Sequence, residues 1–273
     1  MSWAKINQFC KVKARPATEN GDEAPARVQF LMDFLDSMSI KYELDAFEVD
    51  RPSRFINHWG DMLSDSGIDS PKETNKYYNI VIRGSSDKMV VAHHDIVNPN
   101  SDNANDNSAS CINAIMTKSL RPDVNIVILD GEEAPNLGAG SKHCAKRINN
   151  GDFGNIKWVL NLELTGAGGD NFFIGTVRDK SPLKDGILRI FDCPEINVPF
   201  NDSITFRRAG IDSVNINPLP TTEKRTPVSY RGKYLDMDML YNCHSVNDSL
   251  STISTEDMKV FTEQVICRII DEV

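Results

Sequence analysis

The stretch VILDGEEA, residues 127–134, decides the fold and also points to a site. Residues 127–129 form an apolar run without alternation, which is typical of a strand covered on both faces of a sheet. Two adjacent carboxylates, Glu132 and Glu133, follow this run almost at once. In α/β sheets, reactive groups collect in the loops beyond the carboxyl ends of the strands. The stretch therefore predicts an α/β protein with a site at one edge of its sheet.

The flanking segments alternate between helical and strand patterns. Apolar residues at helical spacing predict helices, and β-rich or apolar runs predict strands. We expect a single domain over residues 1–273, a three-layer α/β/α sandwich with a mixed, mostly parallel central sheet. The expected helices span residues 24–38, 108–120, 141–150, 182–192 and a last helix from Ser254, and the expected strands span 41–49, 124–130, 157–164 and 212–218.

Residues 77–95, YYNIVIRGSSDKMVVAHHD, predict a β-hairpin, because two β-rich runs flank the turn residues GSSD at 84–87. Two other segments show no regular pattern. Residues 50–74 are expected to form an irregular insertion rich in Asp, Ser, Pro and Gly. Residues 221–238 are expected to form a loop near the site, either a wall of the specificity pocket or a surface excursion.

The composition excludes several classes of protein. The formal net charge is -9, so we expect no nucleic-acid partner, which would usually leave a basic patch. No apolar run approaches the roughly 20 residues of a membrane span, and the first residues lack the apolar core of a signal peptide. We therefore expect a cytoplasmic protein without membrane association. The six cysteines form no CxxC pair, which favours reduced thiols over a disulfide framework.

Candidate ligand side chains lie just beyond several predicted strands or open a helix. Taken singly, each has a structural interpretation: a histidine at a strand end is often only hydrogen-bonded, Asp106 can cap a helix, and paired glutamates usually face solvent. Glu163 is different, because it lies in the apolar run VLNLEL, where an unpaired carboxylate is costly. Their convergence on one edge of the sheet favours a common site, to which five stretches contribute: His93-His94-Asp95, Asp106, Glu132-Glu133, Glu163 and His244.

This combination of imidazole and carboxylate side chains suits zinc. Zinc accepts histidine nitrogen and carboxylate oxygen, and a catalytic zinc leaves one position for water. Two metal ions about 3.5–4 Å apart can share a bridging carboxylate. Five protein ligands therefore predict a pair of zinc ions, with a single ion as the alternative. When one of the two adjacent glutamates binds metal, its neighbour can act as the general base.

Four short motifs follow one another along the chain: AHHDIV at 92–97, NANDNSAS at 103–110, GEEAPNLGAGS at 131–141 and HSVNDSLSTIS at 244–254. In this order they resemble the motifs of the zinc exopeptidases that include aminopeptidase S, aminopeptidase Y and glutamate carboxypeptidase II, with glutaminyl cyclase as a relative. The resemblance runs from about Tyr77 to the C-terminus.

The resemblance implies a role for each matched residue. One zinc would be held by His93, Glu163 and bridging Asp106, and the other by Asp106, Glu133 and His244. Glu132 would be the general base, and Asp95 would hydrogen-bond His93 and fix the tautomer of its ring. His94 receives no ligand role, and His58 and His143, outside the motifs, are expected at the surface or in packing.

The resemblance also implies a zinc metallopeptidase, with an aminopeptidase acting on peptides or amino-acyl amides as the favoured class. Two alternatives stay open: a glutaminyl cyclase-like acyltransferase with one zinc, and a metal-dependent amide deacylase or carboxypeptidase. Glu163 stands where the peptidases usually carry Asp, whereas the deacylase clan has glutamate there. The segment NDSITFRRAGIDSVNINPLP resembles the cyclases, but Cys243 stands where they tend to carry Trp. Asp202, in that segment, is a substrate contact or a loop cap.

Overall fold

The computed structural model describes residues 3–12, 25–49, 76–98, 100–133, 137–175, 177, 179–198, 201–220 and 242–273. The insertion expected at 50–74, the loop expected at 221–238 and His58 lie outside the described residues. All six cysteines lie inside them and are free thiols, in agreement with the expected absence of a disulfide framework.

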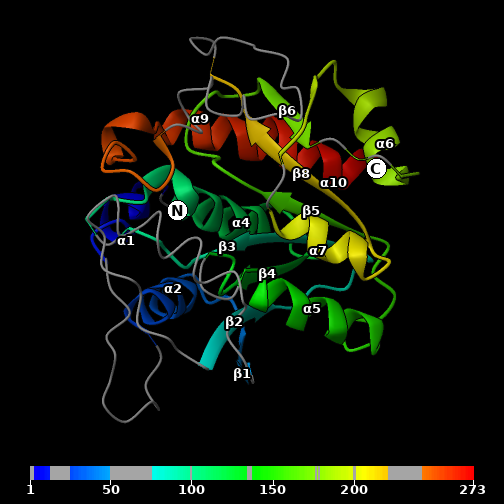
Figure 1. Cartoon of the computed structure of the whole chain (residues 1–273), viewed down its shortest axis with the longest axis horizontal. Coiled ribbons are helices and arrows are strands. Elements are labelled where there is room, and N and C mark those ends of the chain that lie inside the picture. The colour runs from blue at the N-terminus through cyan, green and yellow to red at the C-terminus, as the bar shows by residue number, and fades with distance from the viewer. Residues whose placement is uncertain are drawn as a thin grey trace.

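A mixed sheet forms the middle layer of the molecule (Figure 1). The strands found among the described residues are β1 (Glu43–Glu48), β2 (Lys76–Ile82), β3 (Lys88–His93), β4 (Asn125–Leu129), β5 (Trp158–Leu162), β6 (Phe172–Gly175), β7 (Glu195–Ile196) and β8 (Asp212–Pro218). They lie in the order β1-β2-β4-β3-β5-β8-β6-β7. The pairs β4–β3, β3–β5, β5–β8 and β6–β7 are parallel, and the other three pairs are antiparallel. The predicted fold class is thereby confirmed.

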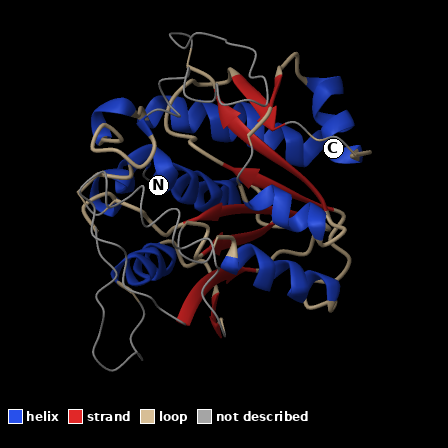
Figure 2. Ribbon diagram, in the orientation of Figure 1, coloured by secondary structure: helices blue, strands red, loops and turns tan. Residues whose placement is uncertain are grey.

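Helices cover both faces of the sheet (Figure 2). They are α1 (Ile6–Phe9), α2 (Ala26–Ser37), α4 (Ala109–Leu120), α5 (Ala139–Asn149), α6 (Pro182–Ile190), α7 (Asp202–Arg208) and a C-terminal helix made of α9 (Thr255–Val260), the irregular stretch η5 (Phe261–Ile266) and α10 (Cys267–Glu272). α5 and α7 lie on the viewer's side of the sheet in Figure 1, and α2, α4 and the C-terminal helix lie behind it.

Each face of the sheet has its own hydrophobic core. On β4, Ile126 and Ile128 face the core that contains α2 and α4. Val127 and Leu129 face the second core, which contains α5 and α7. All four side chains are fully buried. The apolar run of β4 therefore shows no alternation because both of its faces are covered.

The predicted hairpin at residues 77–95 is wrong. β2 and β3 do run in opposite directions, but β4 lies between them and pairs with both. The connection passes around the start of β4, where the backbone N–H of Gly84 donates to Asn125 Oδ1 at 2.9 Å. Two strands that flank a third are only about 9.6 Å apart, which a short connection spans. The strand patterns are the same in both arrangements, so the sequence does not reveal the inserted strand.

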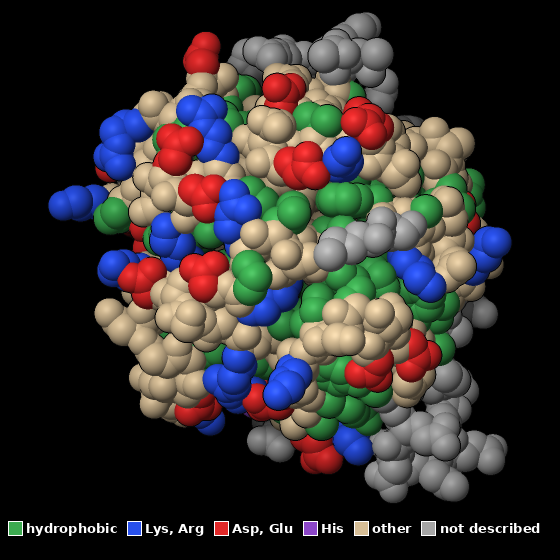
Figure 3. Space-filling view, turned by 180° about the vertical axis from the view of Figure 1, so that it is seen from behind, with side chains coloured by type: hydrophobic (Ala, Val, Ile, Leu, Met, Phe, Trp, Pro, Cys, Tyr) green, Lys and Arg blue, Asp and Glu red, His purple; other side chains and the backbone are tan. Residues whose placement is uncertain are grey.

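Figure 3 shows the face of the molecule opposite to that of Figure 1. Hydrophobic side chains reach the surface near the middle of this face, with Lys, Arg, Asp and Glu side chains around them. Within the part of the chain that the structure describes, no helix has both the length and the apolar character needed to cross a bilayer.

Candidate metal centre

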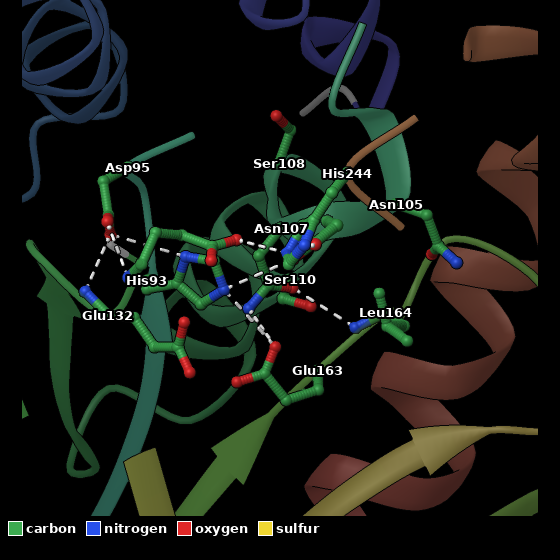
Figure 4. Close-up of polar contacts among 12 residues, drawn as sticks. His93, Asp95, Asn105, Asn107, Ser108, Ser110, Glu132, Glu163, Leu164 and His244 are labelled. Carbon is green, nitrogen blue, oxygen red and sulfur yellow. Dashed lines mark hydrogen bonds and ion pairs between the residues drawn. The ribbon is translucent and has the colours of Figure 1, made fainter. Parts of the chain in front are cut away.

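Parallel strands deliver the candidate ligands to one edge of the sheet. His93 is the last residue of β3, which runs parallel to both β4 and β5. Glu132 and Glu133 lie just beyond β4, and Glu163 directly follows β5. Because the carboxyl ends of parallel strands lie at the same edge, these side chains come together although they are distant in sequence (Figure 4).

A tight turn at Gly131 aims the glutamate pair at this edge. Gly131 has a φ of +72°, and a Cβ at this position would lie 2.8 Å from the ring of Tyr77. Glycine satisfies both conditions, because it adopts positive φ readily and has no side chain to clash. The chain can therefore leave the buried strand β4 and present Glu132 and Glu133 within a few residues.

The imidazoles and carboxylates form two groups that share one residue. The ligand atoms of His93, Asp106 and Glu163 lie within 4.8 Å of one another, and so do those of Asp106, Glu133 and His244. His93 Nε2 lies 3.4 Å from Asp106 Oδ1 and 3.5 Å from Glu163 Oε2. His244 Nε2 lies 3.2 Å from Asp106 Oδ2 and 3.0 Å from Glu133 Oε1. Asp106 thus presents one oxygen to each group.

Glu132 lies beside these two groups. Its ligand atom is within 4.8 Å of those of His93 and Glu133, and Figure 4 shows its side chain pointing into the same space as that of Glu163. Burial raises the pKa of Glu132 well above its usual range, and the charge of Glu133 raises it further. A carboxyl group with a raised pKa is suited to accept a proton near neutral pH.

Asp95 connects His93 to the glutamate pair. Its Oδ1 lies 3.5 Å from His93 Nδ1. The same carboxylate accepts hydrogen bonds from the backbone N–H groups of Glu132 at 3.2 Å and Glu133 at 3.0 Å. Asp95 therefore positions the imidazole ring and both glutamates at once.

Asp248 fixes the loop that carries Asp106. Its two carboxylate oxygens accept hydrogen bonds from the backbone N–H groups of Asn105 at 2.8 Å and Asp106 at 3.0 Å. On the other side, Ser101 Oγ donates to the backbone oxygen of Asp248 at 2.7 Å. Because Asp248 follows His244 closely in sequence, these bonds tie the loops of the two groups to each other.

A row of buried asparagines supports Glu163. Asn107 Nδ2 donates to Glu163 Oε2 at 2.8 Å, and Asn161 Nδ2 donates to Glu163 Oε1 at 3.0 Å. Asn161 Nδ2 also donates to Asn215 Oδ1 at 2.9 Å, and Asn215 Nδ2 in turn donates to Asn217 Oδ1. Both oxygens of Glu163 are thus oriented by amide donors, which offsets the cost of burying the carboxylate.

The surrounding carboxylates favour the charged form of both imidazoles. Burial lowers the pKa of His93, but Glu163 and Asp106 raise it to well above its usual value. The pKa of His244 is raised in the same way, against burial, by Glu133 and Asp106. Although burial raises the pKa of Asp106, its contacts with His244 and His93 hold it below the usual range. The site therefore attracts positive charge, which protons or metal ions can supply.

Two residues of the site have an unusual backbone conformation. His244 has a φ of 62°, and Leu164, which follows Glu163, has a φ of 56°. Residues other than glycine rarely adopt positive φ, and such residues cluster at functional sites. Asn103, near Asp106, also has a positive φ of 45°, whereas Ser39, with a φ of 56°, lies just beyond α2 and outside the site.

Asp202, the first residue of α7, lies deeper in the site. It is only 1% exposed. Burial raises the pKa of Asp202 to about 7, while the charge of His93 and the side chain of Ser141, which is close by, act in the opposite direction. Its charge in turn raises the pKa of Glu132, which places both carboxyls in one electrostatic environment.

The structure brings together every residue that the sequence proposes for the site. His94 stays outside the groups, with its Nε2 3.0 Å from the backbone oxygen of Tyr78. His143 also stays outside and stacks on the ring of Phe47. Asn161 and Asn215 were not predicted from the sequence, although an amide inside an otherwise apolar strand is a visible signal. The residues brought together are His93, Asp95, Asp106, Glu132, Glu133, Glu163, Asp202 and His244.

Comparison of the sequence with protein families gives one match. The sequence profile of Peptidase family M28 matches residues 79–267, which include every predicted ligand. No protein with a curated description matches the sequence significantly.

Solved structures share this fold. The zinc aminopeptidase BSAP of Bacillus subtilis is 20% identical, with a TM-score of 0.55 over 73% of this chain and 50% of its own, so this chain spans about half its length. The LapA aminopeptidase of Legionella pneumophila is 12% identical, with a TM-score of 0.64 over 98% of this chain and 70% of its own. The glutaminyl cyclase of Fimbriiglobus ruber is 17% identical, with a TM-score of 0.67 over 99% of this chain and 93% of its own. At these identities the similarity concerns the fold.

Proposed function

Because the chain belongs to peptidase family M28, we propose that it is a zinc-dependent aminopeptidase, which hydrolyses the N-terminal amide bond of a peptide or an amino-acyl amide. The observation that carries this proposal is the pair of ligand groups that share Asp106. Two metal ions about 3.5–4 Å apart recur in hydrolases, aminopeptidases among them.

The donor atoms fit zinc. Histidine nitrogen and carboxylate oxygen are the ligands that zinc takes in catalytic sites. His93, Asp106 and Glu163 would hold one ion, and Asp106, Glu133 and His244 the other. Divalent cations would also remove the repulsion between the buried carboxylates, which the two imidazoles only partly offset.

Glu132 is the residue that we assign as the general base. Bound zinc would supply a water whose pKa is lowered from 15.7 to about 7, and a positive charge beside the substrate carbonyl. Glu132 takes a proton from water at its carboxylate and returns it to the nitrogen of the leaving amine. Its raised pKa supports this role, because a carboxylate with a raised pKa is a stronger base than an ordinary glutamate. Asp95 holds the backbone of Glu132 and the ring of His93 in position.

Asp202 is our candidate for the contact with the substrate. A carboxylate that is almost fully buried and has no cationic side chain at ion-pair distance in the described part of the chain is an unusual feature. The free amino group of a substrate would bring three N–H donors and a positive charge to it. This contact favours substrates with a free N-terminus, and hence an aminopeptidase.

A glutaminyl cyclase is the second candidate, and one observation favours it. The Fimbriiglobus ruber cyclase matches over 99% of this chain and 93% of its own length, whereas only 50% of the Bacillus subtilis aminopeptidase is matched. A cyclase would use a single zinc. The structure contains two ligand groups, and the presence of the group formed by His93, Asp106 and Glu163 beside the other one argues for the aminopeptidase.

The decisive experiment counts the metal ions and then tests both reactions. Protein purified without chelator is analysed by inductively coupled plasma mass spectrometry, and chromogenic amino-acyl amides and a peptide with N-terminal glutamine are offered as substrates. If the protein is an aminopeptidase, we expect about two zinc ions per chain and release of free amino acids. One zinc with formation of pyroglutamate would identify the cyclase instead. Protein without zinc and without either activity would refute both assignments.

We also propose that the protein works in the cytoplasm. The six free thiols support a reducing compartment, where disulfides are rare. Fractionation of the native cells checks this proposal, and recovery outside the cytoplasmic fraction would contradict it.

A further inference from the structure

Arg27, on α2, is a buried cation next to the metal centre. It lies outside residues 79–267, the range that matches the family profile. The side chain is fixed on all sides, and the residue is only 3% exposed. Its Nη1 donates to the backbone oxygen of Val12 at 3.1 Å, and its guanidinium carbon lies 3.9 Å from the centre of the Phe9 ring.

The other two hydrogen bonds of Arg27 reach the two loops that carry ligands. Its Nε donates to the backbone oxygen of His94 at 2.6 Å. Its Nη2 donates to Ser108 Oγ at 2.8 Å. His94 directly follows His93, and Ser108 lies two residues after Asp106. One rigid, planar group therefore bridges the loop of the first ligand and the loop of the shared carboxylate.

Among the described residues the contacts of the Arg27 guanidinium are two backbone oxygens, one hydroxyl and one ring, with no carboxylate at ion-pair distance. The thiols of Cys10 and Cys111 also lie near Arg27. Burial raises the pKa of each thiol to about 12, so both thiols are neutral. A buried charge is costly unless it is compensated by hydrogen bonds or by charges of opposite sign. Asp95 is the nearby carboxylate whose charge acts on Arg27, and it belongs to the metal centre. The cation is thus placed where it offsets part of the acidic charge there.

Lys118 shows what a purely structural buried cation looks like in the same protein. It is 9% exposed, and its Nζ donates to the backbone oxygens of Arg83 at 2.7 Å, Pro122 at 2.6 Å and Val124 at 2.9 Å. All of these lie at the far end of α4 from Asp106 and contact no candidate ligand. Lys118 is therefore a matched control for burial and hydrogen bonding without a link to the metal centre.

We propose that Arg27 is a positioning residue of the metal centre, which sets the distance between the His93 loop and the Asp106 loop. The N-terminal helix α2 is then a functional part of the site rather than only a cover on the sheet. This inference rests on the proposed zinc site.

The test compares the zinc affinities of Arg27→Met, Arg27→Lys and Lys118→Met with that of the unaltered protein, by competition with the chromogenic chelator 4-(2-pyridylazo)resorcinol. The stability of each zinc-free variant is measured by urea unfolding. We expect Arg27→Met to weaken zinc binding about 10- to 100-fold, the range found for groups that orient metal ligands. Arg27→Lys keeps the charge but loses the planar fork, so its affinity should be intermediate. Lys118→Met should lose stability without a comparable loss of affinity.

If Arg27→Met does not fold, Ser108→Ala provides a second test of the proposal. It removes one acceptor of the guanidinium and leaves the cation in place, so a smaller loss of zinc affinity in the folded variant supports the proposal. Unchanged zinc affinity in Arg27→Lys and Ser108→Ala, or in a folded Arg27→Met, overturns it. An equal loss of affinity in Lys118→Met at equal loss of stability overturns it as well. If the unaltered protein binds no zinc at all, the proposed function fails first and this inference falls with it.

Discussion

Two clusters of charged residues in the described part of the molecule differ in how their carboxylates are compensated by charge and in how much of each cluster is buried. The metal centre contains the two ligand groups and their neighbouring carboxylates. The second cluster, which we call the paired cluster, lies at the β1 edge of the sheet and consists of Glu43, Asp45, Arg83, His143, Arg147 and Asp152. The side chains of Asp106 and Asp45 are similarly buried, at 9% and 12% exposed, whereas Glu43 and Asp152 of the paired cluster are 42% and 43% exposed.

One difference lies in the balance of charge. In the paired cluster each carboxylate contacts a cation of the protein: Arg147 lies 2.7 Å from Asp45 and 2.9 Å from Glu43, and Arg83 lies 2.9 Å from Glu43. In the metal centre the carboxylates meet one another and two imidazoles. A cluster that neutralises itself needs no ligand, whereas a buried cluster of like charges requires a cation from outside the chain. Burial together with uncompensated negative charge therefore distinguishes the candidate metal centre from the paired cluster.

Substitution of Glu132 should have the largest effect of any change in the two clusters. Glu132→Gln removes the proposed base but no ligand, so we expect kcat on amino-acyl amides to fall about 10²- to 10⁴-fold while the zinc content stays the same. Steady-state kinetics and metal analysis check this together. Glu43→Gln in the paired cluster is the matched control and should keep full activity. Substantial activity in Glu132→Gln would remove this residue from the role of base.

Removal of metal should have the next largest effect, because it should destabilise the metal centre and leave the paired cluster unchanged. A ligand present at about 1,000 times its Kd stabilises the folded state by about 4 kcal/mol, so a chelator should lower the free energy of unfolding by an amount of this order. Urea unfolding with and without EDTA measures the effect. Arg147→Met should respond to EDTA as the unaltered protein does, because the paired cluster needs no metal. Equal midpoints with and without chelator would mean that the centre is stable without cations.

A smaller effect is expected from the asparagine row behind Glu163. Asn161→Leu removes the donor to Glu163 Oε1 and leaves Asn215 Oδ1 without that partner. We expect a loss of about 1–3 kcal/mol in stability and about tenfold in zinc affinity. Asn125→Leu is the matched control, since this buried amide bonds to Gly84, Ser86 and Lys88 at the opposite end of the sheet. Unchanged zinc affinity in Asn161→Leu would show that the row serves stability alone.

The smallest effect is expected in the paired cluster itself. Burial raises the pKa of Asp45, but His143 and Arg147 outweigh it and lower the pKa overall. A lowered folded pKa means that the contribution to stability is present above the unfolded pKa and is lost as the pH falls through the folded one. In EDTA, Asp45→Asn should cost about 0.5–1 kcal/mol at pH 6, and the difference should shrink below about pH 4. A difference that grows in acid would contradict this sign.

The sequence predicted most of the fold because the inner strands and long helices have strong local patterns. β4 and α4 appear where the apolar runs and helical spacing place them. The insertion of β4 between β2 and β3 was not predictable, because the pairing partner of a strand is not encoded in its own pattern. The short elements β6, β7 and α7 were missed, because they contain too few residues to show a period.

The candidate site was predictable to the extent that its residues lie at strand ends. His93, Glu133 and Glu163 could be placed at one edge because parallel strands end together. Arg27 and Asn215 could not, because their partners are far away in the sequence and their role appears only in three dimensions. One feature of the sequence does indicate Arg27, because a charged residue stands there on the otherwise apolar face of a helix that also buries Leu31 and Phe34.

The position of β4 also bears on how the polypeptide assembles. β2 and β3 are neighbours in sequence, yet they must stay separated until residues made about forty positions later enter the gap between them. Direct pairing of β2 with β3 is the fastest local event, but it would form a non-native hairpin. The hydrogen bonds of this hairpin would have to break before β4 could enter. The rate of refolding should therefore depend on how fast the unit β3-α4-β4 forms and places β4 beside β2. A chain truncated before Asn125 would lack the strand that joins β2 to β3.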